Sequence, residues 1–181
     1  YHLVHYLPFC SYGHEKVDRC NVAAYYRPCN NRPLNILHFL TMDTLTREER
    51  RRTMQAIKGK NTKPEMIVRS YLFSKGLRYR INVKKLPGSP DIVLKRWKCV
   101  IFVNGCFWHG HQGCFILPKS NSQFWKNKIE RNINRDRDNI ILLENMGWRV
   151  IVVWECEIRK KERRKERLDE IYLEIVSGKT E

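Results

Sequence analysis

The stretch that decides the fold is residues 99–114, which read Cys99-Val-Ile-Phe-Val-Asn-Gly-Cys-Phe-Trp-His-Gly-His-Gln-Gly-Cys114. Its first part, Val100 to Val103, is an unbroken apolar run of β-branched and aromatic residues, which predicts a buried strand. Asn104-Gly105 then marks a turn. The loop that follows concentrates two cysteines, two histidines and an adjacent Phe-Trp pair. We therefore expect the functional site to be built around this strand and its loop.

Patterns on either side of this stretch predict further helices and strands. Thr46-Arg-Glu-Glu49 and Thr62-Lys-Pro-Glu65 are capping boxes, in which the Thr and Glu side chains satisfy the first free N–H groups of a helix. Apolar residues at helical spacing predict helices over 123–146 and 159–176, and short β-type runs lie at 77–83, 91–94 and 148–154. This order predicts an α/β fold, a three-layer sandwich with a central mixed β-sheet flanked by helices.

The chain is expected to consist of a lead and one domain. Residues 1–41 show no sustained hydrophobic period and contain Pro8, Pro28 and Pro33, so we expect a disordered or non-native lead. Met42 stands directly before the first helix signal and is a candidate start of translation. Residues 42–181 contain no repeat and no linker, which predicts a single domain.

The charge of the chain points to a polyanionic partner. Lys and Arg outnumber Asp and Glu by 35 to 19, a formal net charge of +16, which makes nucleic acid the leading candidate and a ribosome-associated protein the alternative. No apolar run approaches the roughly 20 residues of a membrane span, and the N-terminus lacks a signal-peptide pattern. Seven cysteines are an odd number for a disulfide framework. We expect reduced thiols, a cytoplasmic location and no membrane partner.

The cysteine and histidine spacing predicts a structural zinc site. Cys106, His111 and Cys114 lie within nine residues, close enough for one loop to wrap a tetrahedral ion. Cys156 supplies the fourth ligand if the strand before it lies beside Val100 to Val103. Four protein ligands leave no open position for a substrate. The alternative is that these cysteines are simply buried as small apolar residues.

A second centre is predicted at Asp91 and His109. Asp91 follows the stiff turn Pro87-Gly-Ser-Pro90 and precedes an apolar run, a placement suited to holding Mg²⁺ against a phosphate. Pro-Asp before a strand also resembles the first half of the PD-(D/E)XK nuclease signature, whose second half is missing here. His109 lies outside the zinc set, and its ordinary pKa lets it take a proton from water near pH 7.

The chain resembles the very short patch repair (Vsr) endonucleases over about residues 46–157. The resemblance rests on Pro87-Gly-Ser-Pro-Asp91, Cys99 to His109, Phe124-Trp125 with Lys128-Ile129 and Asn132, Arg135-Asp136-Arg137, Gly147-Trp148 and Trp154-Glu-Cys156. It implies a restriction-endonuclease-like fold and a Mg²⁺-dependent enzyme. Such an enzyme nicks one strand of double-stranded DNA 5′ to the thymine of a T:G mismatch.

The resemblance also implies a role for each site residue. Asp91 would be the direct Mg²⁺ ligand with the main-chain carbonyl of Val103, His109 the general base, and Glu65 would act near the metal through water. The structural zinc ligands would be Cys106, His111, Cys114 and Cys156. Phe107, Trp108 and Trp125 would wedge into the base stack. Lys128, Asn132 and Met54 would lie near the mismatched pair.

Several alternatives stay open from the residues alone. Glu65 also fits a purely capping role, and Trp125 also fits the apolar stripe of its helix. Asn104 and Val103 stand where the family's best-known member has histidine and threonine. The chain is therefore also compatible with a nuclease of the same fold without mismatch preference, or with a zinc-stabilised DNA-binding module of weakened catalysis. We expect a monomer, because a single-strand nick is asymmetric, and mismatch-repair proteins as further partners.

Overall fold

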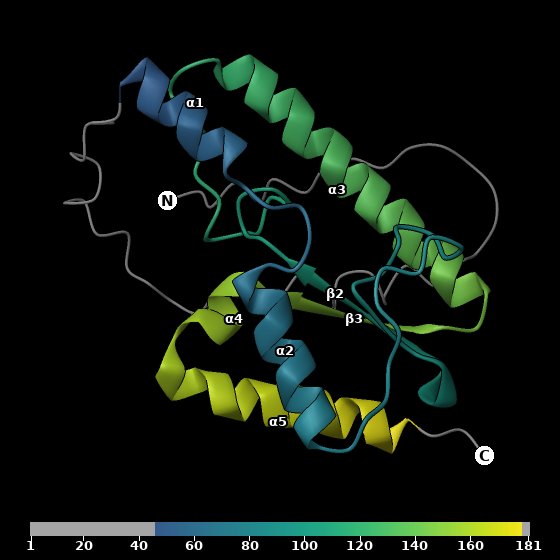
Figure 1. Cartoon of the computed structure of the whole chain (residues 1–181). Helices are drawn as coiled ribbons and strands as arrows, with labels where there is room; N and C mark the ends of the chain where they lie inside the picture. The colour runs from purple at the N-terminus through teal and green to yellow at the C-terminus, as the bar shows by residue number, and fades with distance from the viewer. Residues whose placement is uncertain (1–45, 179–181) are drawn as a thin grey trace, which may run out of the picture.

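The computed structural model describes residues 46–178, so the expected lead over residues 1–41 and the candidate start at Met42 lie outside the described residues (Figure 1). In chain order the elements are α1 (Arg47–Gln55), α2 (Lys63–Ser74), β1 (Ile92–Leu94), the short 3-10 helix η3 (Lys95–Trp97), β2 (Cys99–Asn104), α3 (Ser122–Asn145), β3 (Arg149–Trp154), α4 (Glu155–Arg159) and α5 (Lys161–Ser177). Both predicted capping boxes are confirmed, at Thr46 and at Thr62. No helix in this part of the chain is long and apolar enough to cross a membrane.

The sheet is mixed, as the sequence predicts. Its strand order is β1-β2-β3, with β1 antiparallel to β2 and β2 parallel to β3. The expected strand over residues 77–83 is wrong apart from one bridge, in which Arg80 and Val93 exchange both main-chain hydrogen bonds. Asn82 adopts a φ of 47°, which turns the chain out of the extended conformation directly after this bridge.

Helices cover both faces of the sheet, which makes three layers (Figure 1). Successive strand residues point to opposite faces. Ile101 and Ile151 therefore pack with α2, α4 and α5, whereas Val100 and Val152 pack with Ile140 and the rest of the α3 core stripe. Because each face is buried under a helical layer, the strands read as continuous apolar runs in the sequence.

The last predicted helix is two helices. Lys160 has an extended backbone, with φ −82° and ψ 125°, and separates α4 from α5. Ile158 of α4 is fully buried, and Arg164 of α5 donates from Nε to the Ile158 carbonyl oxygen at 2.7 Å. The break lets α4 turn directly off the end of β3, which places Cys156 beside the sheet edge rather than along a long helix.

Candidate active site and metal centre

The ends of β2 and β3 bring the two halves of the site together. The strands run parallel in a register that pairs Asn104 with Trp154, so both chains leave the sheet at the same edge. The loop after β2 and the first turn of α4 therefore meet. His111 in that loop is 1% exposed, and its ring stacks on the Trp154 ring at 4.0 Å and an interplanar angle of 2°. This stacking anchors the loop over the end of β3.

Four residues from these two segments form a metal-binding cluster. The ligand atoms of Cys106, His111, Cys114 and Cys156 all lie within 4.8 Å of one another. His111 Nδ1 is 3.5 Å from Cys106 Sγ and 3.3 Å from Cys156 Sγ. Ligands ~2.0–2.3 Å from a tetrahedral zinc lie roughly 3.3–3.8 Å apart, so these distances and the sulfur and nitrogen donors fit zinc. The structure thus assembles all four predicted residues.

The thiols of the cluster interact strongly with each other. A hydrogen bond from Cys156 is the main cause that lowers the pKa of Cys106 to about 6, and a hydrogen bond with His111 acts in the same direction. The pKa of Cys156 is raised by the same contact and by burial. One thiolate is therefore easily formed before any cation arrives, and a bound cation would favour deprotonation of the other.

Gly110 explains why the loop can lie against α3. Its φ is 62°, and a Cβ at this position would lie 2.7 Å from Ile133 Cδ1 and 2.9 Å from Ile129 Cγ2. Only glycine combines this backbone conformation with so close an approach. The contact fixes the two flanking histidines, with His111 directed into the metal cluster and His109 placed beside α3.

His109 is held by an acidic residue of α3. Its Nδ1 lies 2.5 Å from Asp136 Oδ2, and both side chains are half-buried. A carboxylate at Nδ1 favours the proton on that nitrogen and leaves Nε2 with a free lone pair for a proton acceptor role. Sequence reasoning quoted Asp136 in a motif but assigned it no role. The signal was its spacing of four residues from Asn132, which places both side chains on one helix face.

Asp91 lies at the same edge of the sheet and is tied to β2. Its Oδ2 accepts a hydrogen bond from the Val103 main-chain N–H at 2.8 Å. Burial is the largest influence and raises the pKa of Asp91 to about 6. The Val103 hydrogen bond lowers this pKa, Glu65 raises it, and Arg69 and His109 lower it. The electrostatic influence of His109 shows that the two predicted catalytic groups face one site.

The surroundings of Asp91 fit a hard cation. Within residues 46–178, Asp91 Oδ1 accepts no hydrogen bond, so one carboxylate oxygen is available to a ligand. The carbonyl of Val103 lies on the same strand edge as its N–H, because an extended residue directs both groups to one neighbouring strand. Mg²⁺ is commonly bound by one or two carboxylates with waters and substrate phosphates making up the rest. Asp91 and Val103 supply such a partial set.

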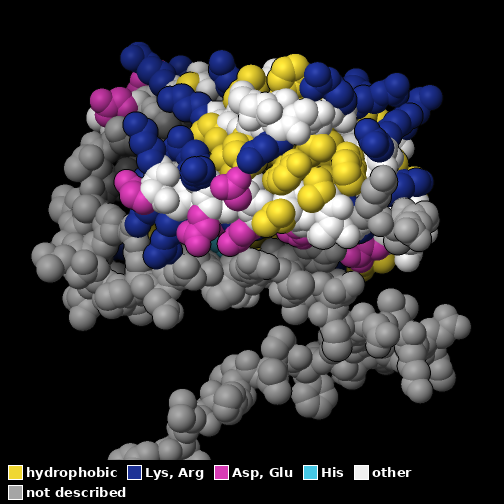
Figure 2. Space-filling model, turned by 90° about the horizontal axis from the view of Figure 1, so that it is seen from below, with side chains coloured by type: hydrophobic (Ala, Val, Ile, Leu, Met, Phe, Trp, Pro, Cys, Tyr) yellow, Lys and Arg dark blue, Asp and Glu magenta, His cyan; other side chains and the backbone are white. Residues whose placement is uncertain are grey.

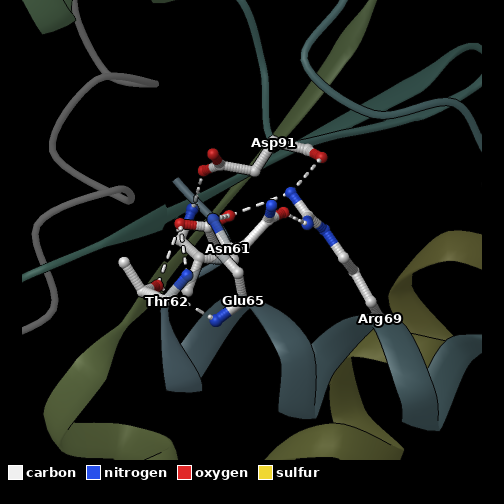
Figure 3. Close-up of polar contacts among 6 residues, drawn as sticks. Asn61, Thr62, Glu65, Arg69 and Asp91 are labelled. Atoms are coloured by element: carbon white, nitrogen blue, oxygen red, sulfur yellow. Dashed lines mark hydrogen bonds and ion pairs between the residues drawn. The ribbon is translucent and has the colours of Figure 1, made fainter. Parts of the chain in front are cut away.

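Glu65 is buried beneath Asp91 and fully engaged (Figure 3). Its Oε1 accepts from Thr62 Oγ1 at 2.9 Å and from the Thr62 N–H at 3.3 Å. Its Oε2 accepts from the Asn61 N–H and from Arg69 Nη2, each at 2.9 Å. A carboxylate offers about four acceptor sites, so the protein fills them all. The capping role is confirmed, while the implied role near the metal stays a prediction.

The predicted wedge residues form one aromatic cluster beside these groups. The ring centroid of Phe107 lies 5.2 Å from that of Trp108 and 5.3 Å from that of Trp125. Phe124, also on α3, extends the cluster with a half-exposed ring 5.3 Å from Trp125. Lys128 Nζ lies over the Trp108 and Trp125 rings at 5.3 and 5.4 Å. The three wedge rings are only partly exposed, so Trp125 serves the cluster rather than the α3 core stripe.

The remaining predicted DNA contacts are distributed differently. Asn132 donates from Nδ2 to the Trp108 carbonyl oxygen at 2.9 Å, so its amide holds the wedge loop on α3. Met54 lies on α1 with an exposed side chain. Whether either touches a mismatched pair stays a prediction, but Asn132 already has a defined contact within the protein.

The surface charge distinguishes two sides of the molecule. On the face that carries α5, Figure 2 shows Asp and Glu side chains among Lys, Arg and apolar groups. Glu162, Glu166, Glu170 and Glu174 are exposed at four-residue spacing and form an acidic ridge along α5. On α3 the exposed side chains include Lys126, Arg131, Arg135 and Arg137. The side with α3 and the loop is therefore better suited to a phosphate backbone.

Comparison with known proteins decides the family. The family model described as DNA mismatch endonuclease Vsr matches residues 42–114. The type II nicking enzyme V.NmeAIP of Neisseria meningitidis serogroup A is 48% identical over 134 residues, which are 74% of this chain and 96% of that protein. This chain belongs to the Vsr family of DNA mismatch endonucleases. It is accordingly a DNA endonuclease, a hydrolase of phosphodiester bonds.

Two further relatives support the membership of this Vsr-family endonuclease. The type II nicking enzyme V.XorIIP of Xanthomonas oryzae pv. oryzae is 52% identical over 118 residues, which are 64% of this chain and 86% of that protein. The DNA mismatch endonuclease Vsr of Escherichia coli K12 is 41% identical over 123 residues, 67% of this chain and 78% of that protein. The family resemblance inferred from the motifs is thus confirmed.

Proposed function

We propose that this Vsr-family endonuclease nicks one DNA strand 5′ to the thymine of a T:G mismatch, using Mg²⁺ at Asp91 and a structural zinc at the Cys/His cluster. The observation that carries the proposal is the meeting of three features at one sheet edge. Asp91 and His109 face each other electrostatically, and the ring cluster of Phe107, Trp108 and Trp125 lies on the same loop and on α3. The restriction-endonuclease-like fold inferred for the chain agrees with its mixed sheet between helices.

The two metals have separate roles in this proposal. Cys106, His111, Cys114 and Cys156 hold zinc, and their closed set of four ligands makes that ion structural. Asp91 and the Val103 carbonyl hold Mg²⁺, which as a Lewis acid stabilises charge on a phosphodiester oxygen when bound. Glu65 acts near that ion without ligating it, since its acceptor sites are already filled.

The protein groups divide the hydrolytic step between them. His109 accepts at Nε2 the proton of the attacking water, whose oxygen forms the new bond to phosphorus while the bond to the leaving sugar oxygen breaks. Asp136 keeps the opposite nitrogen, Nδ1, protonated and fixes the direction of the ring. The aromatic cluster offsets the cost of unstacking bases at the mismatch. A monomer suffices for one nick, and mismatch-repair proteins would act on its product.

One experiment separates this function from its rivals. Two duplexes that differ only by a T:G mismatch are incubated with the full chain and Mg²⁺, and strand cleavage is followed on a denaturing gel. We expect a single nick 5′ to the mismatched thymine and an intact matched duplex. Equal cutting of both duplexes would instead indicate a nuclease without mismatch preference. Binding without cutting would indicate the DNA-binding module that the Asn104 departure keeps open.

The wedge rings should control the mismatch preference in that assay. Trp108→Ala is expected to weaken binding of the mismatched duplex by roughly 5- to 150-fold, because base stacking on an aromatic side chain contributes about 1–3 kcal/mol. Binding of the matched duplex should change far less. Ile116→Ala is a suitable control, since Ile116 is an exposed apolar residue of the same loop region. Equal losses on both duplexes would contradict the wedge role of Trp108.

The His109 and Asp136 pair should affect the chemical step alone. His109→Ala is expected to lower the nicking rate by about 10²- to 10⁴-fold, the usual contribution of general base catalysis. Asp136→Asn should lower it by a smaller factor, because an amide no longer holds the productive tautomer. Single-turnover nicking and equilibrium binding are measured on the same duplex. Unchanged nicking in His109→Ala would exclude His109 as the base.

A further inference from the structure

Arg69 of α2 is a buried arginine that links three segments of the site (Figure 3). Its Nη2 donates to Glu65 Oε2 at 2.9 Å and to the main-chain oxygen of Asp91 at 3.2 Å. Its Nη1 donates to Asn61 Oδ1 at 2.7 Å. The side chain is 5% exposed. One guanidinium therefore joins the start of α2, the turn before it and the Pro-Asp turn before β1.

The bond to the Asp91 carbonyl makes Arg69 more than the counter-charge of Glu65. Asp91 is attached to the site at two points, by its carbonyl to Arg69 and by its carboxylate to the Val103 N–H. Without Arg69 only the carboxylate attachment to β2 is left, and the peptide that carries Asp91 is free to shift over α2. Mg²⁺ demands near-ideal octahedral geometry at short distances, so such a shift would reach any bound ion.

Stability alone does not explain an arginine at this position. Within the described residues Arg69 Nε is buried and makes no hydrogen bond, an arrangement that carries a desolvation cost. A lysine would pair with Glu65 without burying this extra donor. The planar fork of arginine is needed only if several acceptors in fixed directions must be held at once. Here those acceptors are Glu65, Asn61 and the Asp91 carbonyl.

We propose that Arg69 is the positioning residue for Asp91, the group that fixes the metal-binding carboxylate relative to β2 through the Asp91 carbonyl. The proposal rests on the proposed function for its consequence, which is the affinity of the site for Mg²⁺. Its structural content, the placement of Asp91 against the Val103 N–H, does not depend on that function. Arg69 touches neither the DNA nor the reacting atoms in this proposal.

The decisive variant is the double substitution Arg69→Met with Glu65→Gln. Arg69→Met alone would leave the Glu65 carboxylate buried and unpaired, which is strongly destabilising and would hide any specific effect. The double variant removes both charges, and the amide oxygen introduced by Glu65→Gln can still accept hydrogen bonds from Thr62 and Asn61. It keeps the fold while losing only the attachment of the Asp91 main chain. Arg69→Lys complements it, because lysine keeps the charge but cannot hold all three acceptors.

The first measurement is amide hydrogen exchange of the metal-free full chain by NMR. The Val103 N–H, whose acceptor is the Asp91 carboxylate, should exchange at least about tenfold faster in the double variant, as expected when a local contact opens more often. Amides of the β2–β3 ladder should keep their exchange rates. Wild-type protection at Val103 would overturn the proposal. A uniform loss of protection would overturn it as well, since it would show a purely structural role.

The second measurement is the Mg²⁺ dependence of nicking. The Mg²⁺ concentration for half-maximal rate should rise by about 10- to 100-fold in the double variant and in Arg69→Lys, the range typical when a group that orients a metal ligand is lost. The KM for DNA should stay within about twofold. Arg149→Met is the matched control, because Arg149 also donates to main-chain oxygens, those of Glu174 and Ile175, but at the other end of β3. An unchanged Mg²⁺ dependence in the double variant would contradict the proposal.

The two measurements separate failure of this proposal from failure of the proposed function. If the wild-type chain nicks no duplex, the proposed function is wrong, and the exchange of the Val103 amide still decides whether Arg69 positions Asp91. If the wild-type chain nicks the mismatched duplex and the double variant behaves identically in both measurements, the function stands and the role of Arg69 is refuted.

Discussion

Replacing Asp91 by asparagine is expected to abolish nicking and, in metal-free buffer at pH 8, to stabilise the fold. Asparagine keeps an oxygen for the Val103 N–H but removes the charge on which a bound Mg²⁺ depends. A catalytic metal contributes several kcal/mol of transition-state stabilisation, so the rate should fall by at least about 10³-fold. The gain in stability follows from the burial that raises the pKa of Asp91 to about 6.

The sign of the pH dependence follows from the raised pKa. The folded state binds the Asp91 proton more tightly than the unfolded state, whose pKa is near the ordinary value of 3.8. Below pH 3.8 both states are protonated and Asp91 carries no penalty. As the pH rises through 6 the folded state must hold a buried charge, and the penalty approaches about 2–3 kcal/mol. The stability difference between Asp91→Asn and wild type should therefore appear between about pH 4 and pH 7.

Denaturant unfolding at several pH values with a chelator present measures this difference. Asp138→Asn is the control, because Asp138 is an exposed carboxylate on α3 and should show no such gain. A wild-type chain that is more stable than Asp91→Asn at pH 8 would contradict the assignment of Asp91 as a buried charge. Mg²⁺ added to the wild-type chain should reduce the gap, since a ligand that binds only the folded state stabilises it.

Replacing Cys156 by serine is expected to remove the zinc and with it much of the stability. A serine oxygen is a poor ligand for zinc, and the remaining three ligands all lie in the loop after β2, so the link to α4 is lost. Structural zinc sites contribute about 10–16 kcal/mol of binding free energy in small peptides, comparable to the whole stability of a typical domain. The zinc content should fall from about one ion per chain to well below half.

Elemental analysis and thermal unfolding of purified protein test this prediction. Cys99→Ala is the matched control, because Cys99 is equally a cysteine near the sheet but is fully buried in the core and outside the cluster. It should lose a small amount of packing and keep its zinc. A full zinc content in Cys156→Ser, or wild-type protein that binds no zinc, would show that the four residues serve another purpose.

Local patterns explain how much of the fold was predictable. The capping boxes at Thr46 and Thr62 depend on residues three positions apart, and both helices begin where these patterns place them. The strand Cys99–Asn104 and the strand Arg149–Trp154 are legible as apolar runs because both of their faces are buried. The segment 77–83 misled because its apolar pattern is genuine, whereas the φ of Asn82 that interrupts it depends on the surrounding turn.

The site was predictable where chemistry is concentrated in one segment and not where it is spread between segments. Asp91 and His109 announce themselves by residue type and by their neighbours in the chain. Asp136 and Arg69 resemble ordinary helix residues in the sequence, because one lies in a charged run and the other in a capped helix. Their importance comes from contacts with His109, 27 residues away, and with Asp91, 22 residues away.

By itself the sequence determined the strand and loop of residues 99–114, the helices with their caps, the basic charge and the family. These properties depend on neighbours within a turn or two of the chain. Only the tertiary structure decided that Asn104 pairs with Trp154, and hence that Cys156 meets His111 across 45 residues. Parallel register and the break at Lys160 are set by packing between layers, so no local pattern encodes them. The same packing closes the metal cluster, presses Gly110 onto α3 and places Arg69 beneath Asp91.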